Sequence, residues 1–297
     1  MRIPRFEYFR PSSLEEACSL LYKYRGEAKV VAGGTDLFVK MKKKEVLPKV
    51  VISLKGIKNG DAVHWDTVNG LKIGPLVTYH TLLHHPIVKE EFNVLSETCL
   101  KIGTRQVRNM GTLVGNLCNA SPSSDAAAPL LTFDTQLRLI HLNGERIVPL
   151  ERFFVGPFQT VLEPEEIVVE VRIPKLSPRS AGSYQFVHKA SSVGETLVGT
   201  AVLVTMDGKG SFCQDIRIGL CSVGPTPFRA RAAERILIGK PMTEGFVREA
   251  AQVASEETQP RSRPWYRREM TRVTVRRAIL NAMEKMNEKG TDRVKGQ

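Results

Sequence analysis

The chain has 297 residues, of which 42% are hydrophobic, and its 43 basic side chains outnumber the 31 acidic ones to give a formal charge of +12. This length suits two or three globular domains, and no apolar run is long enough to span a membrane. Because no signal-peptide pattern opens the chain and the five cysteines never occur as Cys-x-x-Cys, we expect a cytoplasmic protein with reduced thiols and no zinc or iron–sulfur cluster of its own.

The N-terminal residues alternate between helical and strand patterns. Residues 12–24 combine a capping serine, two glutamates in the first turn and an apolar face, which predicts a helix. Apolar runs at 28–32 and 49–54 predict two buried strands. Between them, the glycine pair at 33–34 ends the first strand, and a second helix is predicted from about Thr35. This order of elements indicates an α/β unit.

The next segment contains two histidines with metal-ligand spacing. His80 and His84 lie one helical turn apart and could share a metal ion. No third ligand has a defined spacing nearby, and Leu82 and Leu83 between them fit an ordinary amphipathic helix. We therefore expect a helix and no metal site here.

Residues 103–130 follow neither a helical nor a strand period. They contain three glycines, three asparagines and a Ser/Pro/Asp cluster, which predicts a loop of unusual length, folded around a ligand or on its own side chains. Further along, residues 135–150 predict a hairpin around Asn143-Gly144, and residues 166–174 predict a strand.

The C-terminal third predicts strands followed by helices. After a proline-containing linker at 175–182, strands are predicted at 183–190, 196–206 and 215–224. Helical patterns follow near residues 228–238, 243–257 and 266–286. This order is typical of a separate α+β domain.

The strong positive charge attracts either nucleic acid or anionic ligands and acidic protein surfaces. The sequence contains no helix-turn-helix, zinc-finger or aromatic RNA-binding signature, so we expect no nucleic acid partner. Familiar catalytic motifs are also missing: there is no Gly-x-Ser-x-Gly, His-Glu-x-x-His, Walker loop or Gly-x-Gly-x-x-Gly.

Two polar segments carry the remaining chemistry. Backbone N–H groups around the glycine pair at 33–34 can surround a phosphate because glycine permits close approach, although an ordinary strand-to-helix turn has the same residues. In the 103–130 segment, hydroxyl, amide and carboxylate groups suit a large polar cofactor. Two such segments in one chain favour a dinucleotide held between two subdomains.

The stretches "VVAGGTDL" at 30–37 and "RQVRNMGTLVGNLCNASPSSD" at 105–125 resemble the two flavin-binding loops of one family. This family comprises the FAD-binding medium subunits of the molybdenum hydroxylases, of the xanthine dehydrogenase and carbon monoxide dehydrogenase type. The stretches "DIRIGLCSVGPTPFRARAAE" and "SRPWYRRE" are similar to motifs of the family's C-terminal domain. The resemblance therefore extends over nearly the whole chain.

The resemblance implies a mixed α/β and α+β fold. Two subdomains, over residues 1–56 and 57–175, would form an FAD-binding fold of the vanillyl-alcohol-oxidase/p-cresol-methylhydroxylase type. An α+β domain with an antiparallel sheet and helices would follow over residues 178–288.

The resemblance also implies which residues hold FAD. The first loop would line the adenosine-diphosphate part with Val31, Ala32, Gly33, Gly34, Thr35, Asp36 and Leu37. The second would contact the flavin, ribityl and pyrophosphate groups with Thr112, Gly115, Asn116, Cys118, Asn119 and Asp125. Lys189 is assigned a place near the flavin, with His188 competing for it. Val114 stands where the family has glycine, and valine is unfavourable there if that position requires a positive φ.

The function implied is that of an electron-transfer subunit. A large partner subunit would carry the molybdenum cofactor, a small partner subunit would carry [2Fe–2S] clusters, and FAD on this chain would pass electrons to NAD⁺ or another acceptor. A purine such as xanthine is the first substrate expected of the complex. The alternatives are a self-contained flavoprotein oxidoreductase of the same fold and, less favoured, a basic binding module.

Overall fold

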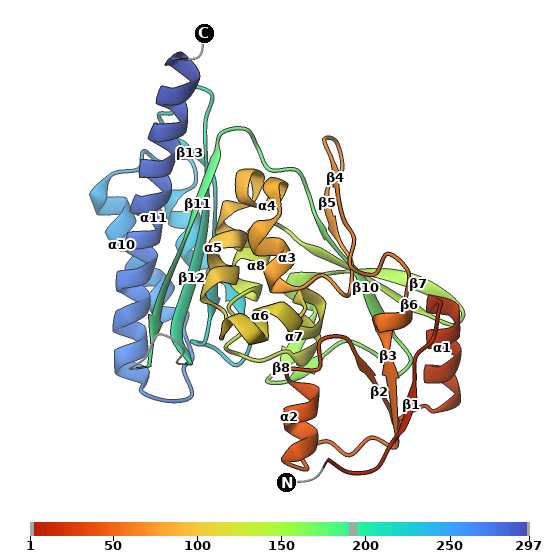
Figure 1. The fold of residues 1–297 in the computed structure, drawn as a ribbon. Coiled ribbons are helices and arrows are strands. Elements are labelled where there is room, and N and C mark those ends of the chain that lie inside the picture. Colours follow the sequence, from red (N-terminus) through yellow and green to blue (C-terminus); the bar gives the residue numbers. More distant parts are fainter. Residues whose placement is uncertain (1–2, 190–194, 296–297) are drawn as a thin grey trace.

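Helices α1 and α2 lie on opposite sides of the N-terminal sheet (Figure 1), and a small apolar core lies under each of them. In this part of the computed structural model, which describes residues 3–189 and 195–295 of the chain, three strands pair in parallel in the order β1-β3-β2. Because side chains alternate along a strand, Val50 and Ile52 pack with α1 on one face, and Val51 packs with α2 on the other. The elements are β1 (Glu7–Phe9), α1 (Leu14–Lys23), β2 (Ala28–Val31), α2 (Leu37–Lys42), β3 (Val50–Ser53) and the 3₁₀ helix η1 (Leu54–Gly56).

The middle of the chain is built on an antiparallel sheet in the order β4-β5-β10-β6-β7. Helices α3 to α8 connect β5 to β6 and enclose the largest apolar core, in which the rings of Phe92 and Phe133 meet edge to face at 5.6 Å. The elements are β4 (Val63–Asp66), β5 (Gly70–Ile73), α3 (Tyr79–His84), α4 (Pro86–Glu91), α5 (Asn93–Lys101), α6 (Arg105–Met110), α7 (Leu113–Asn119), α8 (Ala127–Thr132), β6 (Gln136–His141), β7 (Gly144–Pro149), η2 (Leu150–Arg152), β8 (Phe154–Gly156), β9 (Gln159–Thr160) and β10 (Ile167–Ile173).

The C-terminal part is an antiparallel sheet in the order β11-β12-β13-β14, with α10 and α11 along one face (Figure 1). Every residue of β12 is buried because its two faces belong to different cores. Val202 and Val204 pack with the C-terminal helices, whereas Ala201 and Leu203 pack on the core of the middle part. The elements are β11 (Ser180–His188), β12 (Thr196–Met206), β13 (Cys213–Cys221), β14 (Phe228–Arg229), α9 (Arg231–Leu237), α10 (Glu244–Glu256) and α11 (Pro264–Lys295).

The longer elements lie where the sequence predicts them. Helices α1 and α10 and strand β12 match their predicted ranges, and β6 and β7 form the predicted hairpin around Asn143-Gly144. The linker is shorter than predicted because β11 already begins at Ser180. The predicted end of that strand, Ala190, lies outside the described residues.

The segment at 103–130 is not the long loop that its sequence predicts. It contains α6, α7 and α8, which have 6, 7 and 6 residues. Thr104 and Thr112 cap the first two helices by accepting hydrogen bonds from the N–H groups of Val107 and Gly115. A helix of two turns or fewer is too short to display a 3.6-residue period, so the apolar pattern does not reveal it.

Val114 fits this local structure. It lies inside α7, is buried in the core of the middle part and is not among the residues with positive φ. The departure from the family's glycine therefore creates no backbone strain at this position.

Two further observations concern classes of site. No helix in the described part of the chain is long and apolar enough to cross a membrane. The rings of His80 and His84 lie 4.5 Å apart on α3, but no group of three His, Cys, Asp or Glu side chains that could hold a metal ion occurs among the residues described.

Candidate cofactor-binding site

A cavity of about 930 Å³ lies between the N-terminal sheet and helices α6 and α7. This volume is in the upper part of the range usual for cofactor and ligand pockets. Its wall includes residues from both polar segments that stand out in the sequence. The expected cofactor-binding residues on this wall are Val31, Ala32, Gly33, Gly34, Thr35, Asp36, Leu37, Thr112, Gly115, Asn116, Cys118 and Asn119.

The first wall follows β2, where the chain turns before α2. Gly34 adopts a φ of +75°, a conformation that glycine tolerates best. A Cβ on Gly33 would lie 2.0 Å from the carbonyl oxygen of Met110 at the end of α6, so only glycine allows the two segments to touch. Helix α2 begins at Leu37, later than predicted, and Asp36 in the turn makes no capping hydrogen bond with its side chain.

The second wall is formed by the start and one face of α7. Thr112 pairs with Thr78 in a β-bridge, and its hydroxyl accepts a 3.0 Å hydrogen bond from the N–H of Gly115. The side-chain oxygen of Asn116 accepts a hydrogen bond from the Ser124 hydroxyl, which leaves the Nδ2 group as a donor. Short polar groups fixed in this way suit phosphate and hydroxyl groups of a ligand.

One side chain connects the two walls. Lys40 Nζ on α2 donates a 2.5 Å hydrogen bond to Asn119 Oδ1 on α7 and lies 4.8 Å from the centre of the Phe158 ring. All three residues line the cavity, and the recognised motifs include neither Lys40 nor Phe158. Lys40 follows Asp36 by four residues, a helical spacing that could have indicated its position. No sequence signal marks Phe158.

The titratable groups on the wall have defined charge states. Burial raises the pKa of the Cys118 thiol to about 12, so the thiol stays protonated at neutral pH. Burial alone would raise the pKa of Glu166, but hydrogen bonds from the Arg146 guanidinium and the Glu163 N–H outweigh it, and the pKa is lowered. Of the titratable groups on the wall, Cys118 is therefore a neutral thiol and Glu166 is a carboxylate whose charge is already paired.

Two expected site residues, Asp125 and Lys189, lie away from this wall. Asp125 is buried against the C-terminal sheet, where its carboxylate accepts hydrogen bonds from the hydroxyls of Tyr184 at 2.6 Å and Thr196 at 3.1 Å. Lys189 is exposed just after β11, and its backbone N–H donates to the carbonyl of Glu195. The structure thus brings together every expected cofactor-binding residue except Asp125.

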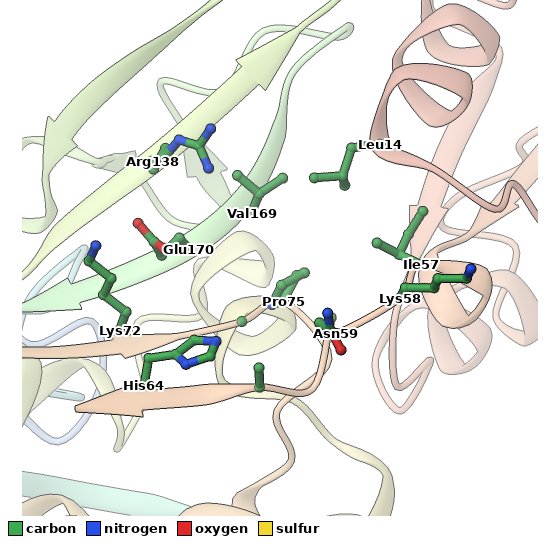
Figure 2. A pocket seen from close by; sticks show the side chains of 13 residues that line it. Leu14, Ile57, Lys58, Asn59, His64, Lys72, Pro75, Arg138, Val169 and Glu170 are labelled. Atoms are coloured by element: carbon green, nitrogen blue, oxygen red, sulfur yellow. The ribbon is translucent and has the colours of Figure 1, made fainter. Parts of the chain in front are cut away.

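A second pocket, of about 160 Å³, opens beside α1 and the five-stranded sheet (Figure 2). Lys72 on β5, Arg138 on β6 and Glu170 on β10 surround it. Arg138 already pairs with Glu145 at 2.6 Å, and Glu170 pairs with Arg172. No expected cofactor-binding residue lines this pocket, so its chemistry differs from that of the larger cavity.

The geometry of the larger cavity suits a dinucleotide. Close backbone approach at Gly33 and Gly34 leaves N–H groups for a diphosphate, and the amide and hydroxyl groups on α7 suit sugar or ribityl hydroxyls. Apolar side chains such as Val107 and Val114 on the same wall suit an aromatic ring system. The residues present therefore fit FAD, and the fold and site together define a protein that binds a dinucleotide cofactor between two lobes.

Comparison with known proteins narrows this class. Residues 4–176 match the family described as the FAD binding domain in molybdopterin dehydrogenase, and residues 189–282 match the CO dehydrogenase flavoprotein C-terminal domain. The chain belongs to the family of FAD-binding subunits of the molybdenum hydroxylases, a family of oxidoreductases, and FAD is its cofactor.

Similar proteins support this assignment over the full chain. The glyceraldehyde dehydrogenase medium chain of Sulfolobus acidocaldarius is 31% identical over 280 residues, covering 93% of this chain and 98% of that one. The xanthine dehydrogenase FAD-binding subunit of Escherichia coli is 27% identical over 256 residues, covering 86% and 87%. The structure of carbon monoxide dehydrogenase from Hydrogenophaga pseudoflava matches with a TM-score of 0.91 at 33% identity, covering 96% of this chain and 99% of that one.

Proposed function

We propose that this chain is the FAD-carrying electron-transfer subunit of a cytoplasmic heterotrimeric molybdenum hydroxylase. A small partner subunit with [2Fe–2S] clusters supplies the electrons, and a large partner subunit holds the molybdenum cofactor. The observation that carries the proposal is that the two family-like loops, distant in sequence, line one cavity. The five cysteines are free thiols, which supports a reducing compartment.

In this proposal the chain's own residues bind and orient the cofactor. FAD, when bound, supplies the chemistry of accepting electrons singly and releasing them as a pair. Backbone N–H groups at Gly33 and Gly34 hold the diphosphate, and the Asp36 carboxylate accepts a hydrogen bond from a ribose hydroxyl. The neutral Cys118 thiol adds no charge beside the flavin. For Asp125 and Lys189, a place near the flavin rests on the resemblance alone.

We further propose NAD⁺ as the electron acceptor and a purine of the xanthine class as the substrate of the complex. The formal charge of +12 favours an anionic acceptor. The similarity to a xanthine dehydrogenase FAD-binding subunit supports the purine. Assay of the assembled complex with xanthine and with glyceraldehyde tests the substrate, and turnover of glyceraldehyde alone would contradict the purine.

The first test is the visible absorption spectrum of the purified chain, followed by chromatography of what it releases on heating. We expect a flavin spectrum and released FAD. In Gly33→Ala the new methyl group meets the Met110 carbonyl, so flavin content should fall at least tenfold. Gly208→Ala is the matched control because nothing lies within 4 Å of a Cβ there. A wild-type chain that stays colourless after incubation with FAD would contradict the proposal.

A second test examines the proposed acceptor, NAD⁺, independently of FAD binding. Under anaerobic conditions, NADH should bleach the flavin absorption of the wild-type chain, since electron exchange with NAD⁺ is reversible. Flavin that dithionite bleaches and NADH does not would overturn NAD⁺ as the acceptor while leaving the FAD-binding role intact.

A further inference from the structure

Lys40 connects the two walls of the cavity. It lies in the last turn of the short helix α2, which follows the glycine turn, and its ammonium group contacts Asn119 and Phe158 on the opposite wall. The hydrogen bond to Asn119 Oδ1 is 2.5 Å long. Asn119 is itself one of the residues expected to contact the cofactor. The ammonium group is therefore partly buried and held at the cavity wall.

The partners of Lys40 leave its positive charge uncompensated. One partner is an uncharged amide oxygen and the other is an aromatic face, and among the described residues no carboxylate forms an ion pair with it. Asp36, four residues earlier, forms no ion pair with it: desolvation raises the pKa of Asp36, and the positive charge of Lys40 opposes that shift. An unpaired ammonium group among neutral partners is a natural site for an anion.

Few other charged side chains on the cavity wall could neutralise an anion. Of the described residues that line the cavity, only Lys29 and Lys40 are cationic. Lys29 lies near the start of β2, at the opposite end of that strand from the glycine turn. Glu166 is already paired with Arg146. Lys29 is nearer in sequence to Gly33 and Gly34, but Lys40 is the cation whose ammonium group reaches Asn119 and Phe158 across the cavity.

We propose that Lys40 neutralises the diphosphate of FAD, exchanging the amide oxygen of Asn119 for a phosphate oxygen when the cofactor binds. This inference rests on the proposed function and adds a binding residue that the two recognised loops do not contain. The exchange also releases the Asn119 side chain for its own contact with the cofactor. The hydrogen bond that Lys40 donates to Asn119 connects α2 to α7.

The test compares three ligands on full-length chain prepared without cofactor. Binding of FAD, ADP and riboflavin is measured by calorimetry for wild type, Lys40→Met, Lys40→Arg and Lys42→Met. ADP contains the diphosphate without the flavin, and riboflavin contains the flavin without the diphosphate. Lys42 is an exposed lysine of the same helix and serves as the matched control.

We expect Lys40→Met to weaken FAD and ADP about tenfold or more and to leave riboflavin unchanged, because a charge-assisted hydrogen bond to phosphate is lost. Lys40→Arg should retain most of the affinity, and Lys42→Met should match wild type. Added salt should weaken ADP binding more steeply in wild type than in Lys40→Met.

Three results would overturn the inference. If Lys40→Met weakens riboflavin as much as ADP, Lys40 acts only by connecting the two walls. If it binds FAD and ADP like wild type, Lys40 has no part in binding. A wild-type chain that binds neither FAD nor ADP would overturn the proposed function as well, which distinguishes the two failures.

Discussion

Asp125 is a carboxylate placed where the middle part meets the C-terminal sheet. Its two oxygens accept hydrogen bonds from the hydroxyls of Tyr184 and Thr196. A Cβ on Gly199 would lie 2.6 Å from the Tyr184 hydroxyl, so glycine is what leaves room for this cluster. Burial raises the pKa of Asp125, although the two hydrogen bonds oppose the shift. The folded protein therefore favours the protonated form more than the unfolded chain does.

This pKa shift predicts the pH dependence of stability. Because the folded pKa of Asp125 exceeds the unfolded value, its contribution to stability is fully present below about pH 4 and is lost as pH rises through the folded pKa. We expect the unfolding free energy of wild type minus that of Asp125→Asn to fall over this range, by about 1.4 kcal/mol per unit of pKa elevation. Urea unfolding at a series of pH values measures it.

Asp66→Asn is the matched control for this prediction. Backbone N–H groups of Asn69 and Val68 lower the pKa of the exposed Asp66, so its contribution to stability is present at higher pH and is lost only in strong acid. Above about pH 4 the difference between wild type and Asp66→Asn should therefore be flat. A wild-type minus Asp125→Asn difference that rises with pH would contradict the assignment of a raised pKa.

The connection between β14 and α9 depends on a buried ion pair. Arg229, which is 7% exposed, makes two 2.9 Å hydrogen bonds to Glu234, which is 2% exposed. Glu234 also accepts a 2.9 Å hydrogen bond from the N–H of Ile218 on β13. Its carboxylate thus fixes the start of the helix to the strand before it and to the sheet.

We expect Arg229→Met to lower the unfolding free energy by about 3–5 kcal/mol, because it removes both hydrogen bonds that Arg229 donates to the buried Glu234 carboxylate and leaves it only a 3.8 Å ion pair with Arg231. Arg272 offers a matched control, since it pairs with Glu269 on the surface of α11. Arg272→Met should cost less than about 1 kcal/mol. Denaturant unfolding of both variants measures these losses. Equal losses of unfolding free energy would show that the buried ion pair stabilises the fold no more than a surface pair does.

The sequence predicts elements well where several turns or a full strand are available. Strand β12 reads as one apolar run and α10 as one amphipathic helix, and both are observed. The short helices α6, α7 and α8 are not predicted, because a helix of one or two turns shows no clear apolar period and their segment has the glycine and short polar residues typical of a loop. Threonine caps mark the starts of α6 and α7, and Thr112 also forms a bridge with the distant Thr78.

The candidate site also contains residues that the sequence predicts and residues that it does not. Its two loops are visible in sequence because glycine and short polar residues are concentrated there. Lys40 and Phe158 are not, because their place in the cavity depends on how α2 and the β8–β9 turn face α7. A contact between residues so far apart along the chain has no local signature, and only the assembled fold reveals it.

The cavity is bordered by two parts of the chain, the N-terminal part and the middle part. Its walls come from the N-terminal sheet and from α6 and α7, and a ligand between them contacts both. FAD should therefore stabilise the chain through binding to the folded state alone, by about 2.7 kcal/mol at a free concentration of 100 times its dissociation constant. We expect thermal unfolding to shift upward by several degrees with FAD and to shift little in Gly33→Ala. An identical melting temperature with and without FAD would contradict this expectation.

The two faces of β12 have a consequence for exchanging parts between relatives. A hybrid that takes its C-terminal part from another medium chain would keep the helical core intact, since Val202, Val204 and the helices they touch come from one parent. Ala201 and Leu203, however, would meet a core inherited from the other parent. Tyr184 and Cys221 on the neighbouring strands meet the same core, so the compatibility of such hybrids depends on one face of the C-terminal sheet rather than on overall sequence identity. Grafting the recipient's side chains at positions 184, 201, 203 and 221 should restore the match.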